Sequence, residues 1–268
     1  MTATAAPLLE TTALCKSFGR LQALSEHHLQ VFPGEIVGVI GPNGSGKSTL
    51  FNLISGFLTP SSGSVRFQGR SLAGLPPAEV ARLGIARTFQ GTRLFKDFSA
   101  LENVRAAAQL RHPTHLLEAV FGLGRYSLQQ AAIEARAREL LERVGLSARA
   151  EVRSGSLPYG EQRRLEIARA LASGPALLML DEPAAGLDSS ETAELLSLLV
   201  GIRNDYGVTI LVIEHDMDLI MNLCERIQVL AQGETIGLGS PLEVQRSSRV
   251  RAAYLGEDDF EPAGATHD

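Results

Sequence analysis

Cysteine is scarce in this chain, and no apolar run is long enough to cross a membrane. Only two cysteines occur among 268 residues, Cys15 and Cys224, and they lack the spacing of metal ligands. This usage predicts structural thiols in a reduced compartment and argues against a disulfide framework. The densest apolar runs, Ala176–Leu180 and Val208–Ile213, have the length of a strand, whereas a spanning helix needs about 20 residues. We expect any membrane span to come from another chain.

The chain also carries neither a basic cluster nor the pattern of a signal peptide. Lys and Arg number 25 against 30 Asp and Glu, which gives a formal net charge of −5. Nucleic-acid-binding domains usually concentrate basic residues on one face, so we predict no nucleic-acid partner. The first residues, Met1–Pro7, are small and uncharged. Because they contain no apolar core, we expect no signal peptide.

One glycine-rich segment carries most of the functional information. An apolar run, Ile36–Ile40, precedes it, and apolar residues at helical spacing follow it. Strand, glycine-rich turn and helix together form the context in which such a turn holds phosphate, because the backbone N–H groups and the helix N-terminus both face the anion. The segment reads Gly41-Pro42-Asn43-Gly44-Ser45-Gly46-Lys47-Ser48-Thr49. In this pattern Lys47 reaches the outer phosphates and Ser48 ligates Mg²⁺. We therefore predict a nucleoside triphosphate site.

A second candidate site follows the apolar residues Leu177–Leu180, where Asp181 and Glu182 precede a proline. Open parallel sheets bind their ligands at the C-terminal ends of the strands. We expect Asp181 to hold Mg²⁺ through water and Glu182 to orient or deprotonate the attacking water. Taken alone, an acidic pair at a strand end is as often a simple cap. Its place downstream of a phosphate loop favours the catalytic interpretation.

His215 follows the next apolar strand, Val208–Ile213. By the same sheet geometry we expect it near Asp181 and Glu182. Its predicted role is a hydrogen bond to the γ-phosphate, which needs a donor nitrogen but not a charged ring. A lone histidine after a strand is otherwise an ordinary surface residue.

The remaining pattern predicts an α/β fold with a mostly parallel sheet. Two N-terminal segments, Leu8–Ser17 and Leu21–Phe32, alternate and predict antiparallel strands. Unbroken apolar runs later in the chain are typical of parallel strands covered by helices. The further expected elements are strands at Ser64–Phe67, Ala176–Leu180 and Val208–Ile213, a hairpin of Ile227–Leu230 and Thr235–Leu238, and helices at Ala78–Leu83 and Glu191–Arg203.

A helical region is expected between Ser99 and Leu146, interrupted by an irregular segment over His112–Arg125. After Gly160, apolar residues lie on one face of a further helix, with Arg163, Arg164 and Glu166 turned elsewhere. The acidic tail is poor in apolar residues, and we expect it to be disordered.

The order of these motifs resembles that of ATP-binding-cassette ATPases. Its elements are the phosphate loop, Gln90 in Arg87-Thr88-Phe89-Gln90, Leu157–Glu161, Asp181-Glu182, Gly186-Leu187-Asp188 and His215. The resemblance covers about Leu8–Gly256 and implies a P-loop NTPase core with an N-terminal antiparallel β region and a helical subdomain. It implies one domain over residues 1–256, with the helical subdomain at about 91–173 and a tail at 257–268.

The resemblance also assigns roles to residues. It implies ATP and Mg²⁺ as cofactors, with Phe18 stacked on adenine and Gln90 contacting metal and nucleotide. It implies a head-to-tail dimer in which the signature segment of one subunit meets the ATP of the other, with Asp188 at the interface. The signature segment here is Leu157, Pro158, Tyr159, Gly160 and Glu161. The family's commonest form has serine at the position of Pro158 and glycine at that of Tyr159, so this chain lacks the usual hydroxyl contact.

Within the family, the chain is most similar to the ATPases of branched-chain amino acid importers. The segments that carry this similarity are Ser55–Phe57, Arg87–Gln90, Tyr159–Ala168, Asp181–Leu187, Glu214–Met217 and Ala253–Gly256. It implies a second ATPase subunit, identical or related, together with membrane permeases and indirectly a periplasmic or extracellular binding protein. The expected location is the cytoplasmic face of a bacterial inner membrane. Urea and amides are the alternative solutes.

Two other functions are weighed against transport. A soluble cassette ATPase acting on nucleic acid or ribosomes usually has two cassettes or long coiled-coil insertions, and this sequence shows neither. A P-loop kinase for a small molecule leaves Leu157–Gln162 and His215 without a role. The order of motifs favours an energising subunit, in which nucleotide binding stabilises one of two conformations.

Overall fold

The computed structural model describes residues 6–109 and 124–254, and the chain divides into two compact units. Unit 1 comprises Met1–Gly74 and Ile213–Asp268, and unit 2 comprises Leu75–Val212. The single domain over 1–256 and its helical subdomain at 91–173 stay predictions. The expected disorder of the tail at 257–268 lies outside the described residues.

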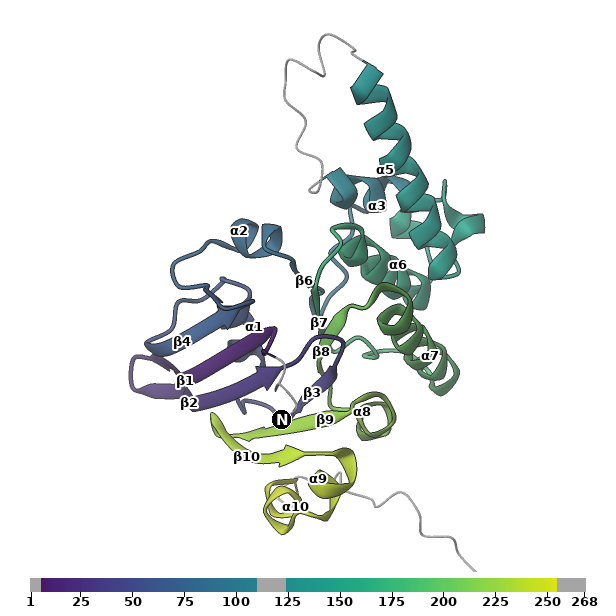
Figure 1. Cartoon of the computed structure of the whole chain (residues 1–268). Helices are drawn as coiled ribbons and strands as arrows, with labels where there is room; N and C mark the ends of the chain where they lie inside the picture. The colour runs from purple at the N-terminus through teal and green to yellow at the C-terminus, as the bar shows by residue number, and fades with distance from the viewer. Residues whose placement is uncertain (1–5, 110–123, 255–268) are drawn as a thin grey trace, which may run out of the picture. The chain divides into compact units, whose positions relative to one another are not determined.

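Unit 1 combines an antiparallel sheet with a second group of strands and the phosphate-loop helix (Figure 1). The antiparallel sheet has the order β2-β1-β4-β5, and the second group has the order β10-β9-β3. The elements are β1 (Leu9–Phe18), β2 (Leu21–Val31), β3 (Ile36–Ile40), α1 (Lys47–Ile54), β4 (Ser62–Phe67), β5 (Arg70–Ser71), α8 (Met217–Leu223), β9 (Arg226–Ala231), β10 (Glu234–Gly239), α9 (Pro241–Arg246) and α10 (Ser248–Tyr254).

The N-terminal hairpin confirms the prediction of antiparallel strands. β1 pairs with β2 from Leu9 opposite Val31 to Phe18 opposite Leu21. Apolar side chains on one face of the hairpin, including Leu14 and Leu24, are fully buried, as expected of a sheet with one face on the core. The predicted closing hairpin is confirmed as well, since β9 and β10 pair antiparallel.

Strand β3 positions the glycine-rich loop. All five of its residues are buried, and it runs parallel to β9, with Val37 opposite Arg226 and Ile40 opposite Val229. Six residues separate the end of the strand from helix α1, which buries Leu50, Phe51 and Ile54. Both ends of the loop are therefore anchored by apolar burial.

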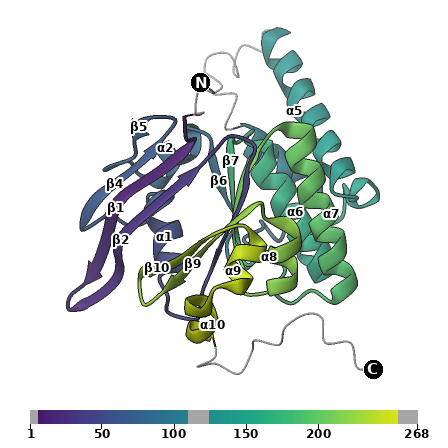
Figure 2. The same cartoon turned by 60° about the horizontal axis from the view of Figure 1, so that its bottom comes forward.

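Unit 2 holds parallel strands and most of the long helices (Figure 2). Its strands lie in the order β8-β7-β6, and β6 runs parallel to β7. The elements are α2 (Pro77–Arg82), β6 (Ile85–Arg87), α3 (Ala100–Ala108), α5 (Gly124–Arg143), the 3₁₀ turns η2 (Ser147–Arg149) and η3 (Ser154–Ser156), α6 (Tyr159–Ala172), β7 (Leu177–Asp181), α7 (Ser189–Tyr206) and β8 (Thr209–Ile213). The predicted α/β fold is confirmed, and all residues of β7 and β8 are buried.

The helices of unit 2 pack around a shared apolar core. Helix α3 begins with a capping box formed by Ser99 and Glu102, and α3, α5 and α6 contact one another. On α5, Ile133 and Leu140 are fully buried, whereas Leu128 is 73% exposed. The helical spacing therefore identified the core only in the C-terminal half of α5. The predicted irregular segment over His112–Arg125 extends too far, because α5 already begins at Gly124; residues 110–123 lie outside the description.

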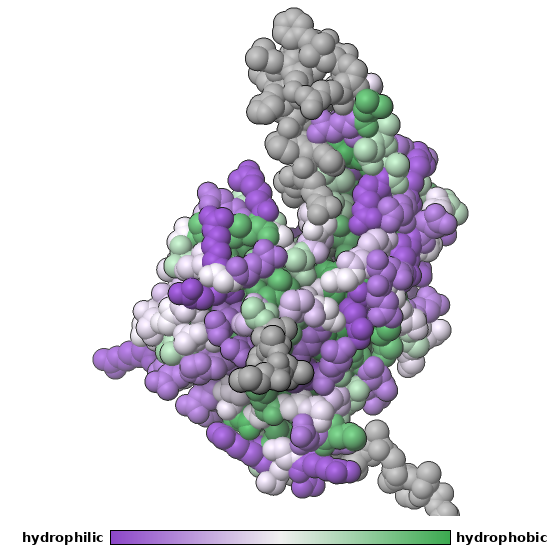
Figure 3. All heavy atoms as spheres, viewed as in Figure 1, coloured by the Kyte–Doolittle hydropathy of each residue, from purple (hydrophilic) through white to green (hydrophobic). Residues whose placement is uncertain are grey.

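The surface of the described residues gives no sign of a membrane span. Among them, no helix combines the length and the hydrophobicity that a bilayer crossing requires. On the face in view in Figure 3, hydrophilic residues gather along the helices of unit 2, in agreement with the Arg- and Glu-rich sequence of α5.

Candidate nucleotide site

The phosphate loop is shaped by glycines with positive φ. Gly41, Gly44 and Gly46 have φ values of 151°, 78° and 105°, a region that residues with a Cβ rarely adopt. A Cβ on Gly41 would lie 2.0 Å from the carbonyl oxygen of Leu230, and one on Gly46 would lie 2.6 Å from that of Ala23. The loop therefore passes too close to neighbouring backbone for any side chain at these two positions.

Polar groups of the loop match the chemistry of a phosphate ligand. Lys47 is buried, and its Nζ donates hydrogen bonds to the carbonyl oxygens of Gly41 at 2.6 Å and Pro42 at 2.9 Å. The hydroxyl of Ser45 is buried and has no hydrogen-bond partner among the described residues. The backbone N–H groups of a helix's first turn have no intrahelical acceptor. A phosphate would supply the acceptors that both the Ser45 hydroxyl and the start of α1 need.

The residues also fit a magnesium ion held jointly with nucleotide. Ser48 lies exposed in the first turn of α1. No group of three or more His, Cys, Asp or Glu residues within 6–109 and 124–254 is arranged to hold a metal. Mg²⁺ is commonly bound by one or two protein oxygens together with substrate phosphates and water, so the residue types predicted here are sufficient for it. The metal assignments of Ser48, Gln90 and Asp181 stay predictions.

Two further predicted residues lie in unit 1. Phe18 ends β1 with 46% of its surface exposed, and the Nζ of Lys16 lies 5.1 Å from its ring centroid. It is therefore not a core residue, and its ring is free to stack on a base. The side chain of His215 is 67% exposed, with Nδ1 3.7 Å from Oε2 of the buried Glu214. Its predicted proximity to Asp181 and Glu182 stays a prediction, since those residues belong to unit 2.

In unit 2, strand β7 ends at the acidic pair, as predicted. Asp181 is buried and accepts a hydrogen bond through Oδ2 from the guanidinium of Arg87 at 2.8 Å. The backbone N–H of Asp181 donates to the Thr88 hydroxyl at 3.3 Å. Arg87 ends β6, the strand paired with β7. The structure thus gives Asp181 an arginine partner that the sequence analysis did not foresee.

Glu182 lies next to Gln90. The Nε2 of Gln90 donates a hydrogen bond to Oε2 of Glu182 at 2.9 Å. Glu182 adopts φ 47°, a left-handed conformation that costs a residue with a side chain about 1–3 kcal/mol and that clusters at functional sites. Gln90, predicted to contact metal and nucleotide, and Glu182, predicted to act on the attacking water, are therefore in direct contact across 92 positions of sequence.

The signature segment forms the start of α6. Leu157 and Pro158 are extended, and the helix begins at Tyr159 without a side-chain cap, so Gly160 and Glu161 lie in its first turn. Glu161 forms an ion pair with Arg149 at 3.3 Å. The uncapped first turn leaves backbone N–H groups for an anion, although proline replaces the serine of the commonest family form.

Asp188 caps the next helix. Its Oδ1 accepts a hydrogen bond from the backbone N–H of Glu191 at 2.8 Å, which completes a capping box at the start of α7. A Cβ on Gly160 would lie 2.5 Å from Oε1 of Glu191, and one on Gly186 would lie 3.1 Å from the ring of Tyr159. The signature segment and the Asp188 segment are therefore packed together within unit 2. The predicted interface role of Asp188 stays a prediction.

The sequence analysis did not identify Arg163 and Glu166 as site residues. They do lie on a different face of α6 from the apolar residues, but the side chains are only 3% and 2% exposed. Arg163 donates hydrogen bonds to the carbonyl oxygens of Phe89 at 3.1 Å and Gln90 at 2.8 Å. An Arg and a Glu three residues apart on a helix are ordinarily a surface pair, so their spacing gave no signal of burial.

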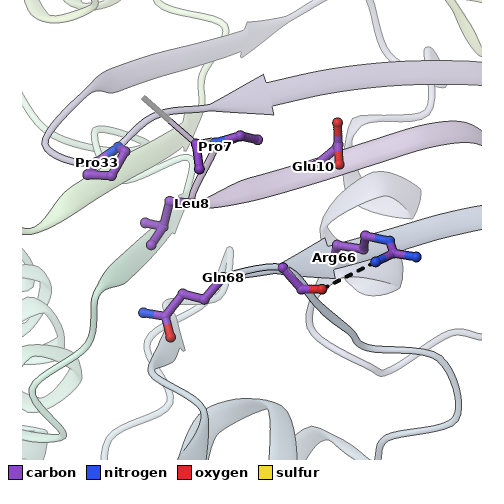
Figure 4. A pocket seen from close by; sticks show the side chains of 8 residues that line it. Pro7, Leu8, Glu10, Pro33, Arg66 and Gln68 are labelled. Carbon is purple, nitrogen blue, oxygen red and sulfur yellow. Dashed lines mark hydrogen bonds between the residues drawn. The ribbon is translucent and has the colours of Figure 1, made fainter. Parts of the chain in front are cut away.

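A pocket of about 520 Å³ in unit 1 contains none of the predicted site residues. Its lining includes Leu8, Glu10, Pro33 and Gln68, together with Arg66, which donates to the carbonyl oxygen of Gly69 at 3.3 Å (Figure 4). The predicted phosphate-binding residues instead lie in the loop after β3 in unit 1, and Gln90, Asp181 and Glu182 lie at or after the ends of β6 and β7 in unit 2.

Comparison with known proteins agrees with this geometry. The model of the ABC transporter family matches residues 24–185. The high-affinity branched-chain amino acid transport ATP-binding protein LivG of Escherichia coli K12 is 43% identical over 251 residues, which are 94% of this chain and 98% of that protein.

Solved structures give the same result. The ADP conformation of MJ1267, an ATP-binding cassette of an ABC transporter, has a TM-score of 0.81 at 30% identity and covers 94% of this chain and 100% of that one. A dimeric post-hydrolysis state of the cassette MJ0796 with ADP and Pi has a TM-score of 0.73 at 28% identity and covers 87% of this chain and 98% of that one. The chain belongs to the ABC transporter family and is one of its ATP-binding, ATP-hydrolysing subunits.

Proposed function

We propose that this chain hydrolyses ATP to energise the uptake of branched-chain or related amino acids through membrane permeases. The observation that carries the nucleotide chemistry is the loop from Gly41 to Thr49, whose glycines, buried Lys47 and unpaired Ser45 hydroxyl suit a triphosphate. The solute class is supported by the 43% identity to LivG, a branched-chain amino acid transport ATP-binding protein.

Binding of ATP is assigned to unit 1. The Lys47 ammonium exchanges the carbonyl oxygens of Gly41 and Pro42 for the outer phosphates, while N–H groups of the loop and of α1 meet the remaining phosphate oxygens. Phe18 stacks on adenine. Ser48, Gln90 and Asp181 would hold Mg²⁺, which when bound neutralises charge on the phosphates.

Hydrolysis is assigned to the residues at the ends of β7 and β8. Glu182 orients the attacking water and accepts its proton as the bond from water oxygen to the γ-phosphorus forms and the bond to ADP breaks. Gln90 holds the Glu182 carboxylate in one orientation through its 2.9 Å hydrogen bond. His215 donates a hydrogen bond to the γ-phosphate. Each contribution is positioning or charge stabilisation.

The working unit is a dimer of ATPases, made of two copies of this chain or of this chain and a related one. The segment Leu157–Glu161 of one subunit meets the ATP held by the other, and Asp188 lies at their interface. The uncapped first turn of α6 supports an anion-binding role, and the dimeric MJ0796 structure supports the assembly. Tyr159 and Pro158 stand where the commonest family form has smaller or hydroxylated residues.

The chain works at the cytoplasmic face of a bacterial inner membrane, to which permeases bind it. A periplasmic or extracellular binding protein delivers the solute, and nucleic acid is not a partner. The lack of a membrane-spanning helix among the described residues fits a peripheral subunit.

Reconstitution with the permeases tests this proposal. The chain is incorporated with them into proteoliposomes, binding protein is added, and uptake of labelled leucine, isoleucine and urea is measured with ATP on the ATPase side. We expect ATP-dependent uptake of the amino acids and none with Glu182→Gln. Uptake of urea alone would reassign the solute. ATPase activity stimulated by nucleic acid but not by permeases would favour a soluble, non-transport ATPase.

A further inference from the structure

The backbone after β6 is held in place by side chains of α6. Residues Thr88–Phe98 form neither helix nor strand, so their backbone polar groups need partners from elsewhere. Arg163 supplies donors to the carbonyl oxygens of Phe89 and Gln90. Glu166 accepts from the backbone N–H of Arg93 at 3.4 Å. Helix α6, which begins with the signature segment, thereby fixes the course of the segment that carries Gln90.

Arg163 is the central residue of this arrangement. Its guanidinium is buried, bonded to two consecutive carbonyls and paired with Glu166 Oε2 at 3.4 Å. The planar fork of arginine suits two adjacent acceptors, which a lysine ammonium matches poorly. A buried charge is retained only where its partners compensate for its desolvation, so the guanidinium holds these carbonyls in defined positions.

Further charged side chains surround the segment that carries Gln90. Burial raises the pKa of Glu166, opposed by hydrogen bonds from backbone N–H groups and by the charges of Arg163 and Arg169. Arg169, one turn farther along α6, donates to the carbonyl oxygen of Arg93. Two guanidinium groups lie near the Phe89 ring, that of Arg87 at 5.0 Å and that of Arg93 at 4.4 Å from its centroid. The segment around Gln90 is therefore held at both its backbone and its side chains.

The guanidinium of Arg163 contacts both the signature segment, at Tyr159, and the backbone of Gln90. On one side it lies 5.2 Å from the ring centroid of Tyr159, a residue of the signature segment. On the other it holds the carbonyl of Gln90, whose side chain donates to Glu182. A continuous set of contacts thus runs from Tyr159 through Arg163 and Gln90 to the candidate base.

We propose that Arg163 is a positioning residue, which couples the signature helix to catalysis by setting the location of Gln90 and, through it, the orientation of Glu182. This inference rests on the proposed function. A shift of α6 at its Tyr159 end would move the guanidinium and hence the Gln90 carbonyl, so the geometry of the hydrolytic site depends on what the signature segment contacts. A misplacement of about 1 Å can reduce a catalytic rate about 100-fold.

The test is a double-mutant cycle in ATP turnover with the full chain. Arg163→Lys keeps the positive charge opposite Glu166 but loses the planar guanidinium that donates to two adjacent carbonyls. We expect kcat to fall about 10- to 100-fold, with KM for ATP changed less than about twofold. Gln90→Ala removes the side chain that reaches Glu182 and leaves the Gln90 carbonyl bonded to Arg163. In the Gln90→Ala background, Arg163→Lys is expected to change kcat by less than about twofold.

Arg164→Lys is the matched control. Arg164 is the next residue on α6 and forms a surface ion pair with Glu194 at 3.3 Å; such pairs contribute about 0–1 kcal/mol, so turnover should be unchanged. If Arg163→Lys lowers kcat by the same factor with and without Gln90, the residue is merely structural and the inference is wrong. Unchanged kcat in Arg163→Lys overturns it equally.

A second variant and a second measurement keep the test decisive. If Arg163→Lys does not fold, as judged by its thermal unfolding, Arg163→Gln takes its place in the same cycle, since a neutral amide can still donate to one carbonyl. Amide hydrogen exchange is followed at Phe89–Arg93, where faster exchange is expected in either variant and unchanged exchange contradicts the inference. If the wild-type chain hydrolyses no ATP with Mg²⁺, the proposed function fails and the inference fails with it. If the wild type is active but the effects of Arg163→Lys and Gln90→Ala on kcat are additive, only the inference is wrong.

Discussion

The amide of Gln90 contacts the carboxylate of Glu182 at 2.9 Å, and Glu182 has a left-handed backbone conformation with φ 47°. A positive φ at a residue with a side chain persists only where surrounding contacts hold it. Here the contact comes from a segment 92 residues earlier in the chain. A carboxylate that a distant amide holds on such a backbone is suited to orient a water molecule.

Glu182→Gln should retain ATP affinity and lose at least about 100-fold in kcat, because the amide keeps the shape of the carboxylate but accepts no proton. Phosphate release and equilibrium nucleotide binding measure the two effects, and gel filtration with ATP should show accumulation of dimer. Glu79→Gln, at an exposed residue of α2, is the control and should behave like the wild type. Undiminished turnover in Glu182→Gln would remove Glu182 from the mechanism.

Lys47→Ala should weaken ATP binding by about 10- to 100-fold, since hydrogen bonds to charged groups contribute about 1.5–3 kcal/mol. Titration with a fluorescent ATP analogue measures the affinity. Lys96→Ala, at an exposed lysine of unit 2, controls for the loss of one positive charge. Equal affinities of the wild type and the Lys47 variant would contradict the assignment of the loop.

Gly41→Ala should destabilise the fold far more than Gly44→Ala does. Both glycines have positive φ, but a Cβ on Gly41 would lie 2.0 Å from a backbone oxygen, whereas one on Gly44 meets nothing within 4 Å. We expect about 1 kcal/mol for Gly44→Ala and more than about 3 kcal/mol for Gly41→Ala. Urea unfolding gives both values, and similar losses for the two variants would show that the close approach to Leu230 is absent.

The stability of the chain should fall as the pH falls from about 6.5 to about 4. His27 is fully buried between Thr11 and Gln228, and burial lowers its pKa from 6.5 to about 4. In this window the unfolded state binds the proton and the folded state does not, so the free energy of unfolding decreases with falling pH, by at most about 3 kcal/mol.

Urea unfolding at several pH values checks this dependence. His27→Asn should flatten it, whereas His215→Asn, at a histidine whose side chain is 67% exposed, should leave it as it is. A wild-type free energy of unfolding that does not change between pH 6.5 and 4.5 would contradict the neutral, buried state of His27.

The local elements could be predicted from the sequence because their signals are local. The apolar run Ile36–Ile40 and the glycines after it define a strand and a turn within a dozen residues, and the structure confirms both. Likewise, apolar residues followed by Asp181 and Glu182 placed the acidic pair at the end of a strand. In both cases the residues from which the strand or turn was predicted are the same residues that form it.

Partners across long sequence distances could not be predicted in this way. The burial of Arg163 and Glu166 depends on the course of Phe89–Arg93, which lies about 70 residues earlier. The pairing of Asp181 with Arg87 depends on the register of two parallel strands. Charged residues are mostly exposed in folded proteins. The sequence alone therefore predicts solvent exposure for Arg163, Glu166, Asp181 and Arg87, whose side chains are largely buried.

Calorimetric titration of the purified chain with ATP and Mg²⁺ decides whether the phosphate loop of this ATPase holds ATP. We expect saturable binding with a Kd below about 1 mM that is weakened in Lys47→Ala. A folded wild-type chain that shows no detectable binding at millimolar ATP would rule out this role of the loop.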